Sequence, residues 1–243
     1  MDSGGPRAGD RPWGVSTPPA MNRGRNGPGI ALPGACSIVA VGHHGRVIPT
    51  APLERIGAMK ALKPTAEQIA SAYGKTVPDV IAVGLKVLFC GINPSLYSAA
   101  VGQHFARPGN RFWPALEAGG FTARRLSPWE SDVLLGLGCG ITNVVDRATT
   151  AAEELAADEY VVGGKALVAK ATTYRPNYVA FLGIGSYRAA FARPKAAIGP
   201  QEERIGPSRI WVLPNPSGLN AHYKLADLAI LFATLRSASD RVG

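Results

Sequence analysis

Two stretches decide the fold: VLFCGINPS at residues 87–95 and IWVLPNPSGL at residues 210–219, each with an apolar run before an Asn-Pro-Ser element. The apolar runs are rich in residue types that favour β-strands. We therefore expect both loops to leave the same edge of one parallel sheet, which is where open α/β folds bind ligands. The proline after Asn93 and after Asn215 favours an extended backbone and removes one amide donor, so both carboxamides should point in fixed directions.

Strand-like stretches alternate with helical stretches through most of the chain. Thr65, three residues before Gln68, is the predicted N-cap of a short first helix that runs to about Tyr73. The alternation predicts an α/β protein, a three-layer α/β/α sandwich with a short, mainly parallel central sheet. The predicted strands are 86–91, 140–145, 178–182 and 209–213, and the predicted helices are 111–118, 129–137, 151–172, 186–191 and 224–236.

The N-terminal part differs in composition from the rest. Residues 1–63 form a basic leader rich in glycine and proline, which we expect to be largely disordered, whereas residues 64–243 should form one folded domain. The leader holds eight Lys/Arg against three Asp/Glu, and so contributes +5 of the formal net charge of +9. Its pattern does not fit a secretory signal, and no apolar run in the sequence is long enough to cross a membrane.

The cysteines also bound the class of protein. Cys36, Cys90 and Cys139 are odd in number and widely spaced, which fits neither a disulfide framework nor a closed four-ligand metal site. We therefore expect a reducing cytoplasmic location and no metal.

Three longer motifs occur in order: GINPSLYSA at 91–99, HFARPGNRFW at 104–113 and VLPNPSGL at 212–219. Together they resemble the mismatch-specific uracil-DNA glycosylase family, which includes thymine-DNA glycosylase. The resemblance extends from Val83 to the C-terminus and includes GITNVVDR at 140–147. It implies a uracil-DNA glycosylase-like fold and a monomeric enzyme without a cofactor, which hydrolyses the N-glycosidic bond of uracil mispaired with guanine in double-stranded DNA. Thymine and etheno-cytosine are further implied substrates, and enzymes that repair abasic sites would act next.

The family match implies that Asn93 positions the water that attacks the sugar C1′. A carboxamide can accept and donate hydrogen bonds, but it cannot take a proton at neutral pH, so Asn93 should orient the water without deprotonating it. The departing uracil anion needs fixed donors, for which backbone NH groups after Pro94 are candidates. Taken alone, the Asn-Pro pair favours the plainer interpretation, an asparagine that merely closes an Asx-turn before a helix.

The same match places Gly91, Ile92, Ser98 and Phe105 around the extruded base. Phe105 would stack on the pyrimidine, a contact worth about 1 to 3 kcal/mol. Without the surrounding motif, the simpler interpretation of Phe105 is an ordinary core residue, and that of Ser98 is a helix cap.

The second loop supplies the predicted DNA wedge. Chemistry on a base in a duplex requires the nucleotide to leave the stack, and an exposed apolar side chain can fill the vacancy. Leu219 is that candidate, with Asn215, Ser217 and Gly218 predicted to contact the opposite base. The alternative is a simple turn that returns Leu219 to the core.

Two positions depart from the family pattern. Ser95 stands where glycine is usual after the catalytic Asn-Pro, and we expect its Cβ to narrow the pocket or alter pyrimidine preference. Ala221 stands where some relatives carry an arginine that helps to read guanine.

Parts of the sequence also fit two other functions. Gly-rich turns at 136–140 and 183–186 could suggest a nucleotide-binding protein, but neither has the G-x-G-x-x-G spacing after a strand. A non-catalytic binder of mispaired or damaged DNA could retain both the pocket and the wedge, so this alternative stays open.

Overall fold

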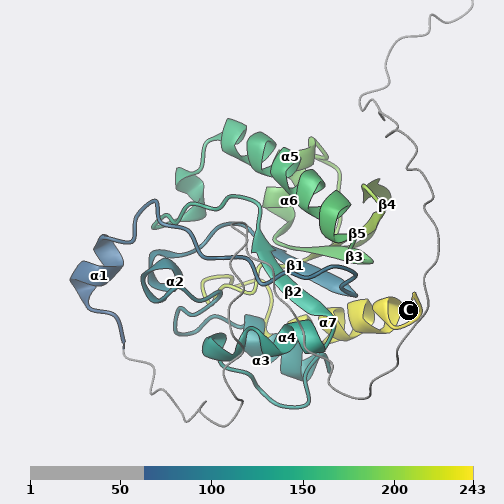
Figure 1. The fold of residues 1–243 in the computed structure, drawn as a ribbon, viewed down its shortest axis with the longest axis horizontal. Helices are drawn as coiled ribbons and strands as arrows, with labels where there is room; N and C mark the ends of the chain where they lie inside the picture. The colour runs from purple at the N-terminus through teal and green to yellow at the C-terminus, as the bar shows by residue number, and fades with distance from the viewer. Residues whose placement is uncertain (1–62, 243) are drawn as a thin grey trace, which may run out of the picture. The chain divides into compact units, whose positions relative to one another are not determined.

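The computed structural model describes residues 63–242 of the chain (Figure 1). Its centre is a five-stranded sheet in the order β2-β1-β3-β5-β4. Strands β1 (Val87–Gly91), β2 (Cys139–Asn143), β3 (Tyr178–Leu182) and β5 (Ser208–Leu213) are parallel, and β4 (Gly199–Ile205) pairs antiparallel with β5. Residues 1–62 of the predicted leader, Cys36 among them, lie outside the described residues.

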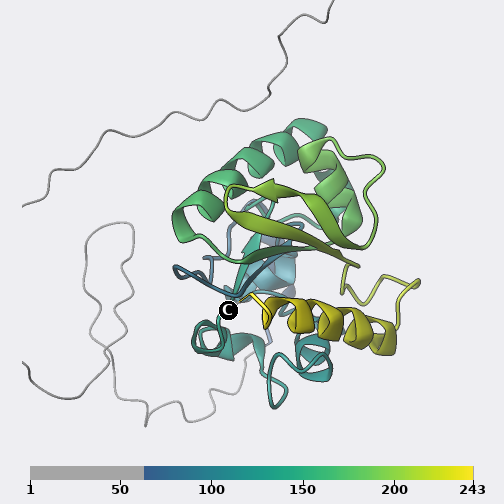
Figure 2. The same ribbon diagram turned by 90° about the vertical axis from the view of Figure 1, so that its right-hand side faces the viewer.

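Helices cover both faces of the sheet, as Figure 2 shows. One face carries α5 (Ala157–Tyr174) and α6 (Ile184–Phe191), and the other carries α3 (Phe112–Ala118), α4 (Val133–Gly136) and α7 (Leu225–Ser239). Two short helices, α1 (Ala66–Ala70) and α2 (Leu96–Val101), pack on each other at the margin. The predicted α/β/α sandwich is confirmed.

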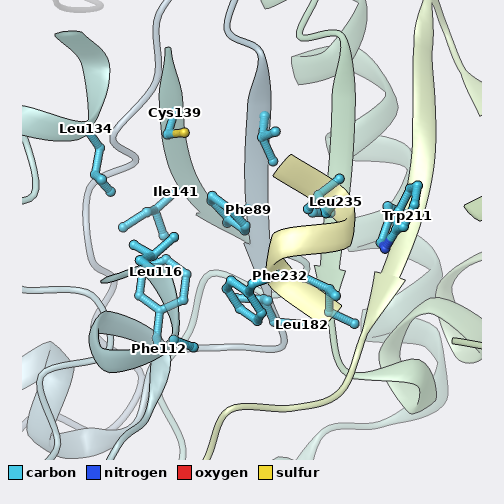
Figure 3. Close-up of a cluster of buried hydrophobic side chains, with 14 of the residues drawn as sticks. Phe89, Phe112, Leu116, Leu134, Cys139, Ile141, Leu182, Trp211, Phe232 and Leu235 are labelled. Atoms are coloured by element: carbon cyan, nitrogen blue, oxygen red, sulfur yellow. The ribbon is translucent and has the colours of Figure 1, made fainter. Parts of the chain in front are cut away.

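The strands alternate side chains between two cores because successive residues point to opposite faces of a sheet. Phe89 faces α3 and α7, where it stacks on Phe232 and meets Phe112 edge to face (Figure 3). Cys90 and Phe181 face α5 and α6. All four parallel strands are almost wholly buried, which explains the continuous apolar runs in β1, in β3 and at 210–213 of β5.

The predicted strand 178–182 is confirmed, and the predicted first helix is present but ends at Ala70, before the predicted end near Tyr73. Thr65 caps α1 through a capping box with Gln68. Strand β2 ends at Asn143, two residues before the predicted end, and the amides of Val144 and Val145 then bond to the carbonyls of Gly91, the last residue of β1, and of Ile92.

Three sequence predictions were wrong in detail. The stretch 151–172 is not one helix: Ala152–Glu154 forms a 3₁₀ turn, Leu155 and Ala156 are extended, and α5 starts at Ala157. The stretch 129–137 likewise divides into the 3₁₀ turn Pro128–Glu130 and α4. Strand β4 was missed because an edge strand with one exposed face reads as polar loop sequence. No helix among residues 63–242 has the length and apolar character needed to cross a membrane.

Candidate active site

A cavity of about 350 Å³ opens at the carboxyl ends of β1, β2 and β3. Its volume lies at the lower end of the range of about 300 to 1,000 Å³ that is typical of small-ligand sites. Chain connections leave β1 and β3 in opposite directions along the sheet, which makes this the switch point where α/β folds bind ligands. The predicted site residues that line the cavity are Gly91, Ile92, Asn93, Ser98, Phe105, Asn215, Ser217 and Leu219.

Asn93 follows β1 and is held by its amide nitrogen. Nδ2 donates to the carbonyl oxygen of Arg147 at 3.1 Å and to the hydroxyl of Thr149 at 2.7 Å. The Thr149 hydroxyl donates its only hydrogen to the carbonyl oxygen of Ala151 at 2.8 Å, so it must act as the acceptor in its hydrogen bond with Asn93. Both amide hydrogens are therefore used, and Oδ1 is the polar atom left for a ligand. The sequence predicted a side chain that both donates and accepts, whereas this geometry makes it an acceptor.

An ion pair with Glu159, at the start of α5, holds the side chain of Arg147 in position. Nε and Nη2 approach the two carboxylate oxygens at 2.5 and 2.8 Å. The hydrogen bonds from Arg147, and then that from the Ala156 amide, lower the pKa of Glu159 from 4.5 to about 2, and the pair raises the pKa of Arg147. The carboxylate thus anchors the segment whose carbonyl orients Asn93.

Phe105 and Gly91 form one wall of the cavity. The centroid of the Phe105 ring lies 4.1 Å from the centroid of the buried Phe112 ring, with an angle of 31° between the two ring planes. Its backbone has φ 53°, a left-handed conformation that costs a non-glycine residue about 1 to 2 kcal/mol. A Cβ on Gly91 would lie 3.2 Å from this ring and would collide with the side chain of Asn143, so only glycine lets both side chains approach the end of β1.

Asn143 is a candidate functional residue that sequence reasoning did not single out. It ends β2 directly opposite Gly91, is 4% exposed and lines the cavity. Thr149 was missed in the same way. The available signal for Asn143 was a carboxamide inside a predicted strand, within the 140–147 motif.

Ser98 and Ser95 form a small hydroxyl network. Ser95 is the N-cap of α2, and its Oγ accepts from the Ser98 amide and donates to Ser98 Oγ at 3.1 Å. Ser98 Oγ also accepts from the Ala106 amide at 3.1 Å. Ser98 is buried, and its hydroxyl therefore tethers the residue after Phe105. This bond helps to hold the strained Phe105 backbone over the cavity.

His104 supports the same wall as a neutral ring. Its Nε2 lies 2.9 Å from the Pro78 carbonyl oxygen, so this nitrogen carries the hydrogen. Burial lowers the pKa of His104, with the bond to Pro78 opposing that shift in part. His104 is therefore uncharged at neutral pH and its Nε2 hydrogen is already bound.

The loop after β5 forms the rim of the cavity. Asn215 Oδ1 accepts from the Ser217 amide at 2.9 Å, so this carboxamide shapes its own loop. Leu219 projects with 76% of its surface exposed and does not return to the core. Gly218 does not line the cavity. A Cβ there would lie 2.6 Å from the Gly109 carbonyl oxygen, so glycine permits close packing of the two loops.

Within residues 63–242 no group of three or more His, Cys, Asp or Glu side chains could hold a metal ion. Cys90 and Cys139 are buried thiols, and burial raises the pKa of both, that of Cys139 to about 12.

The fold and the cavity define an α/β/α sandwich protein with a ligand site at the carboxyl edge of its sheet. A family described as the Uracil DNA glycosylase superfamily matches residues 78–236, well over half of the chain, and the chain belongs to this superfamily. Its members act on DNA. Among solved structures, the chain is similar to a candidate uracil DNA glycosylase from Methanosarcina acetivorans determined by solution NMR, with 20% identity, a TM-score of 0.45, and coverage of 67% of this chain and 98% of that chain.

Proposed function

We propose that this protein is a monofunctional, mismatch-specific DNA glycosylase, which hydrolyses the N-glycosidic bond of uracil mispaired with guanine in double-stranded DNA. Thymine and etheno-cytosine mispaired with guanine are further proposed substrates. The observation that carries the proposal is the state of Asn93: both amide hydrogens are bound to the protein, and its free acceptor belongs to a cavity walled by Phe105.

In the proposed reaction, Asn93 Oδ1 accepts a hydrogen bond from water and holds the water oxygen toward C1′ of the extruded nucleotide. The bond between C1′ and N1 breaks and its electron pair leaves with uracil, which departs as a delocalised anion. The water oxygen then bonds to C1′ and the water proton passes to solvent, because a carboxamide cannot take it. The product is an abasic site, which abasic-site repair enzymes would process.

Two residues would recognise the base itself. Phe105 presents its ring for stacking, and Asn143 presents a carboxamide that can accept from the N3 hydrogen of uracil while donating to a neighbouring carbonyl. The backbone amides near the start of α2 are candidate hydrogen-bond donors to O2 of uracil. The amide of Ser98 is not among them, because it already donates to Ser95 Oγ.

Leu219 would fill the space that the extruded nucleotide leaves. Unstacking costs a few kcal/mol and less at a mismatch, so a wedge gains selectivity from the weakness of the mispair itself. The 76% exposed side chain at the cavity rim supports this role.

The deciding experiment is single-turnover cleavage of duplexes that carry one uracil opposite guanine, with abasic sites revealed by alkali. Matched duplexes with uracil opposite adenine and thymine opposite guanine report the selectivity. We expect cleavage of the uracil–guanine duplex at the highest rate. Tight binding to that duplex without abasic sites would instead favour the non-catalytic binder.

A second assay tests whether the enzyme is monofunctional. No lysine lines the described cavity, which supports hydrolysis by water over attack by an amine. We therefore expect borohydride to trap no covalent complex with uracil-containing DNA. A trapped complex would contradict the monofunctional assignment.

A further inference from the structure

Arg111 connects the two motifs that flank the cavity, although they lie about a hundred residues apart in sequence. It stands at the N-cap of α3. Its backbone amide donates to the Pro216 carbonyl oxygen at 2.9 Å, and its Nη1 donates to the Tyr223 carbonyl oxygen at 2.5 Å. Its Nη2 donates to the carbonyl oxygens of Asn220, at 2.8 Å, and of Ser217. One residue thus makes four hydrogen bonds to the loop 216–223.

The three carbonyl groups that meet the guanidinium belong to residues 217, 220 and 223. A regular spacing of three residues around one planar cation means that the loop curls around it. Leu219 lies between two of these anchored positions. The loop forms neither helix nor strand, and Pro216 has no amide hydrogen to donate, so Arg111 supplies donors that the pairing within a helix or sheet would otherwise provide.

We propose that Arg111 is a positioning residue that holds Leu219 outward before DNA arrives. This inference rests on the proposed function and adds that the wedge is preorganised. An exposed leucine on a free loop would lower its free energy by turning toward the apolar core, and the loop would then have to be reordered on every encounter with DNA. The guanidinium avoids that cost by fixing the backbone on both sides of the side chain.

Lysine cannot replace arginine here. A guanidinium presents its donors in a rigid planar fork, whereas an ammonium is a compact charge on a flexible stem. Arg111→Lys keeps the charge and can keep one of the carbonyl bonds, but it cannot hold three carbonyls in the same geometry. Arg175→Lys is the matched control, because exposed Arg175 caps the C-terminal end of α5, ahead of β3 and at the opposite edge of the sheet.

The test compares wild type, Arg111→Lys, Leu219→Ala, the double variant and Arg175→Lys on a uracil–guanine duplex and on single-stranded uracil DNA. We expect Arg111→Lys to slow single-turnover cleavage of the duplex by about 10- to 100-fold and to change single-strand cleavage by no more than about twofold. The double variant should be no slower on the duplex than Leu219→Ala, because both changes remove the same wedge. Arg175→Lys should behave as wild type.

Equal losses on duplex and single strand, or losses of the two variants that multiply on the duplex, would overturn the proposal. Hydrogen exchange of the free proteins provides a readout that does not need activity. Arg111→Lys should speed exchange of the amides in residues 217–222 and leave the sheet unchanged; unchanged exchange in the loop would also overturn the proposal. If wild type cleaves neither substrate, the proposed function fails, and the exchange result still decides whether Arg111 orders the loop.

Discussion

At the residue scale, the direction of the Asn93 side chain follows from donor and acceptor counting. The Arg147 carbonyl can only accept, and the Thr149 hydroxyl has already given its hydrogen to Ala151. The amide nitrogen must therefore face this segment, and the oxygen is left for the ligand. A proline after the asparagine restricts the backbone, but these partners set the side chain.

Asn93→Ala removes the proposed water acceptor. We expect the single-turnover rate on a uracil–guanine duplex to fall by about 10² to 10⁴-fold, the range for a positioned catalytic group, while DNA affinity changes little. Asn177→Ala is the control, since Asn177 lies just before β3 at the opposite edge of the sheet. Unchanged cleavage by Asn93→Ala would remove Asn93 from the mechanism.

At the element scale, Ser95 explains one departure from the family pattern. The sequence suggested that its Cβ narrows the pocket, and Ser95 does line the cavity. Its hydroxyl, however, caps α2 and holds Ser98, which in turn holds the amide after Phe105. The serine therefore stabilises the element that carries the cavity wall.

Ser95→Ala should lower the free energy of unfolding by about 0.5 to 2 kcal/mol, because the cap bond to the Ser98 amide is lost. Ser95→Gly should cost only a few tenths of a kcal/mol, since glycine tolerates an N-cap position. Denaturant unfolding of both variants measures the difference. A glycine variant less stable than the alanine variant would contradict the capping role.

The ion pair between Arg147 and Glu159 couples α5 to the loop that orients Asn93. Because folding lowers the pKa of Glu159 from 4.5 to about 2, the pair stabilises the fold fully above about pH 4.5, and that contribution is lost as the pH falls through about 2. Glu159→Gln should therefore have a lower Tm than wild type at neutral pH, and the two melting temperatures should converge in acid.

Thermal unfolding from pH 7 to pH 2 checks this expectation, with Glu202→Gln on the exposed edge strand β4 as the control. A Glu159→Gln difference that stayed constant with pH would show that the carboxylate charge is not what stabilises the segment.

At the scale of the whole molecule, charge is unevenly distributed along the chain. Residues 1–63 contribute +5 of the net +9, although the family match begins only at residue 78. We propose that residues 64–243 are the glycosylase domain and that the leader adds non-specific DNA affinity through its cations.

Removing residues 1–63 should leave the single-turnover rate at saturating enzyme within about twofold of that of the full chain, and should weaken DNA binding at low salt. Each leader cation that contacts a phosphate contributes about 0.9 to the slope of log affinity against log salt. Binding titrations over a salt series test this. A leader of equal length with glutamine in place of Lys/Arg is the control, and it should behave as the truncated chain does.

Local sequence determined the strands β1, β3 and β5, the helices α3, α6 and α7 to within a few residues, and the edge at which both Asn-Pro-Ser loops meet. These features follow from apolar periodicity and from glycine and proline, which act within a few residues. Local sequence did not predict β4, because the outer face of that strand is polar. It also predicted one helix over 151–172, although Leu155 and Ala156 are extended.

Only the tertiary structure decided the partners of the site. Asn93 meets Arg147 and Thr149 more than fifty residues away, and Arg111 meets its loop across more than a hundred. Hydrogen bonds of this kind depend on where elements pack, and no local pattern of residues records that packing. The sequence thus placed the candidate site residues at one edge of a sheet, and the packing of distant segments determined which of their polar atoms remain free.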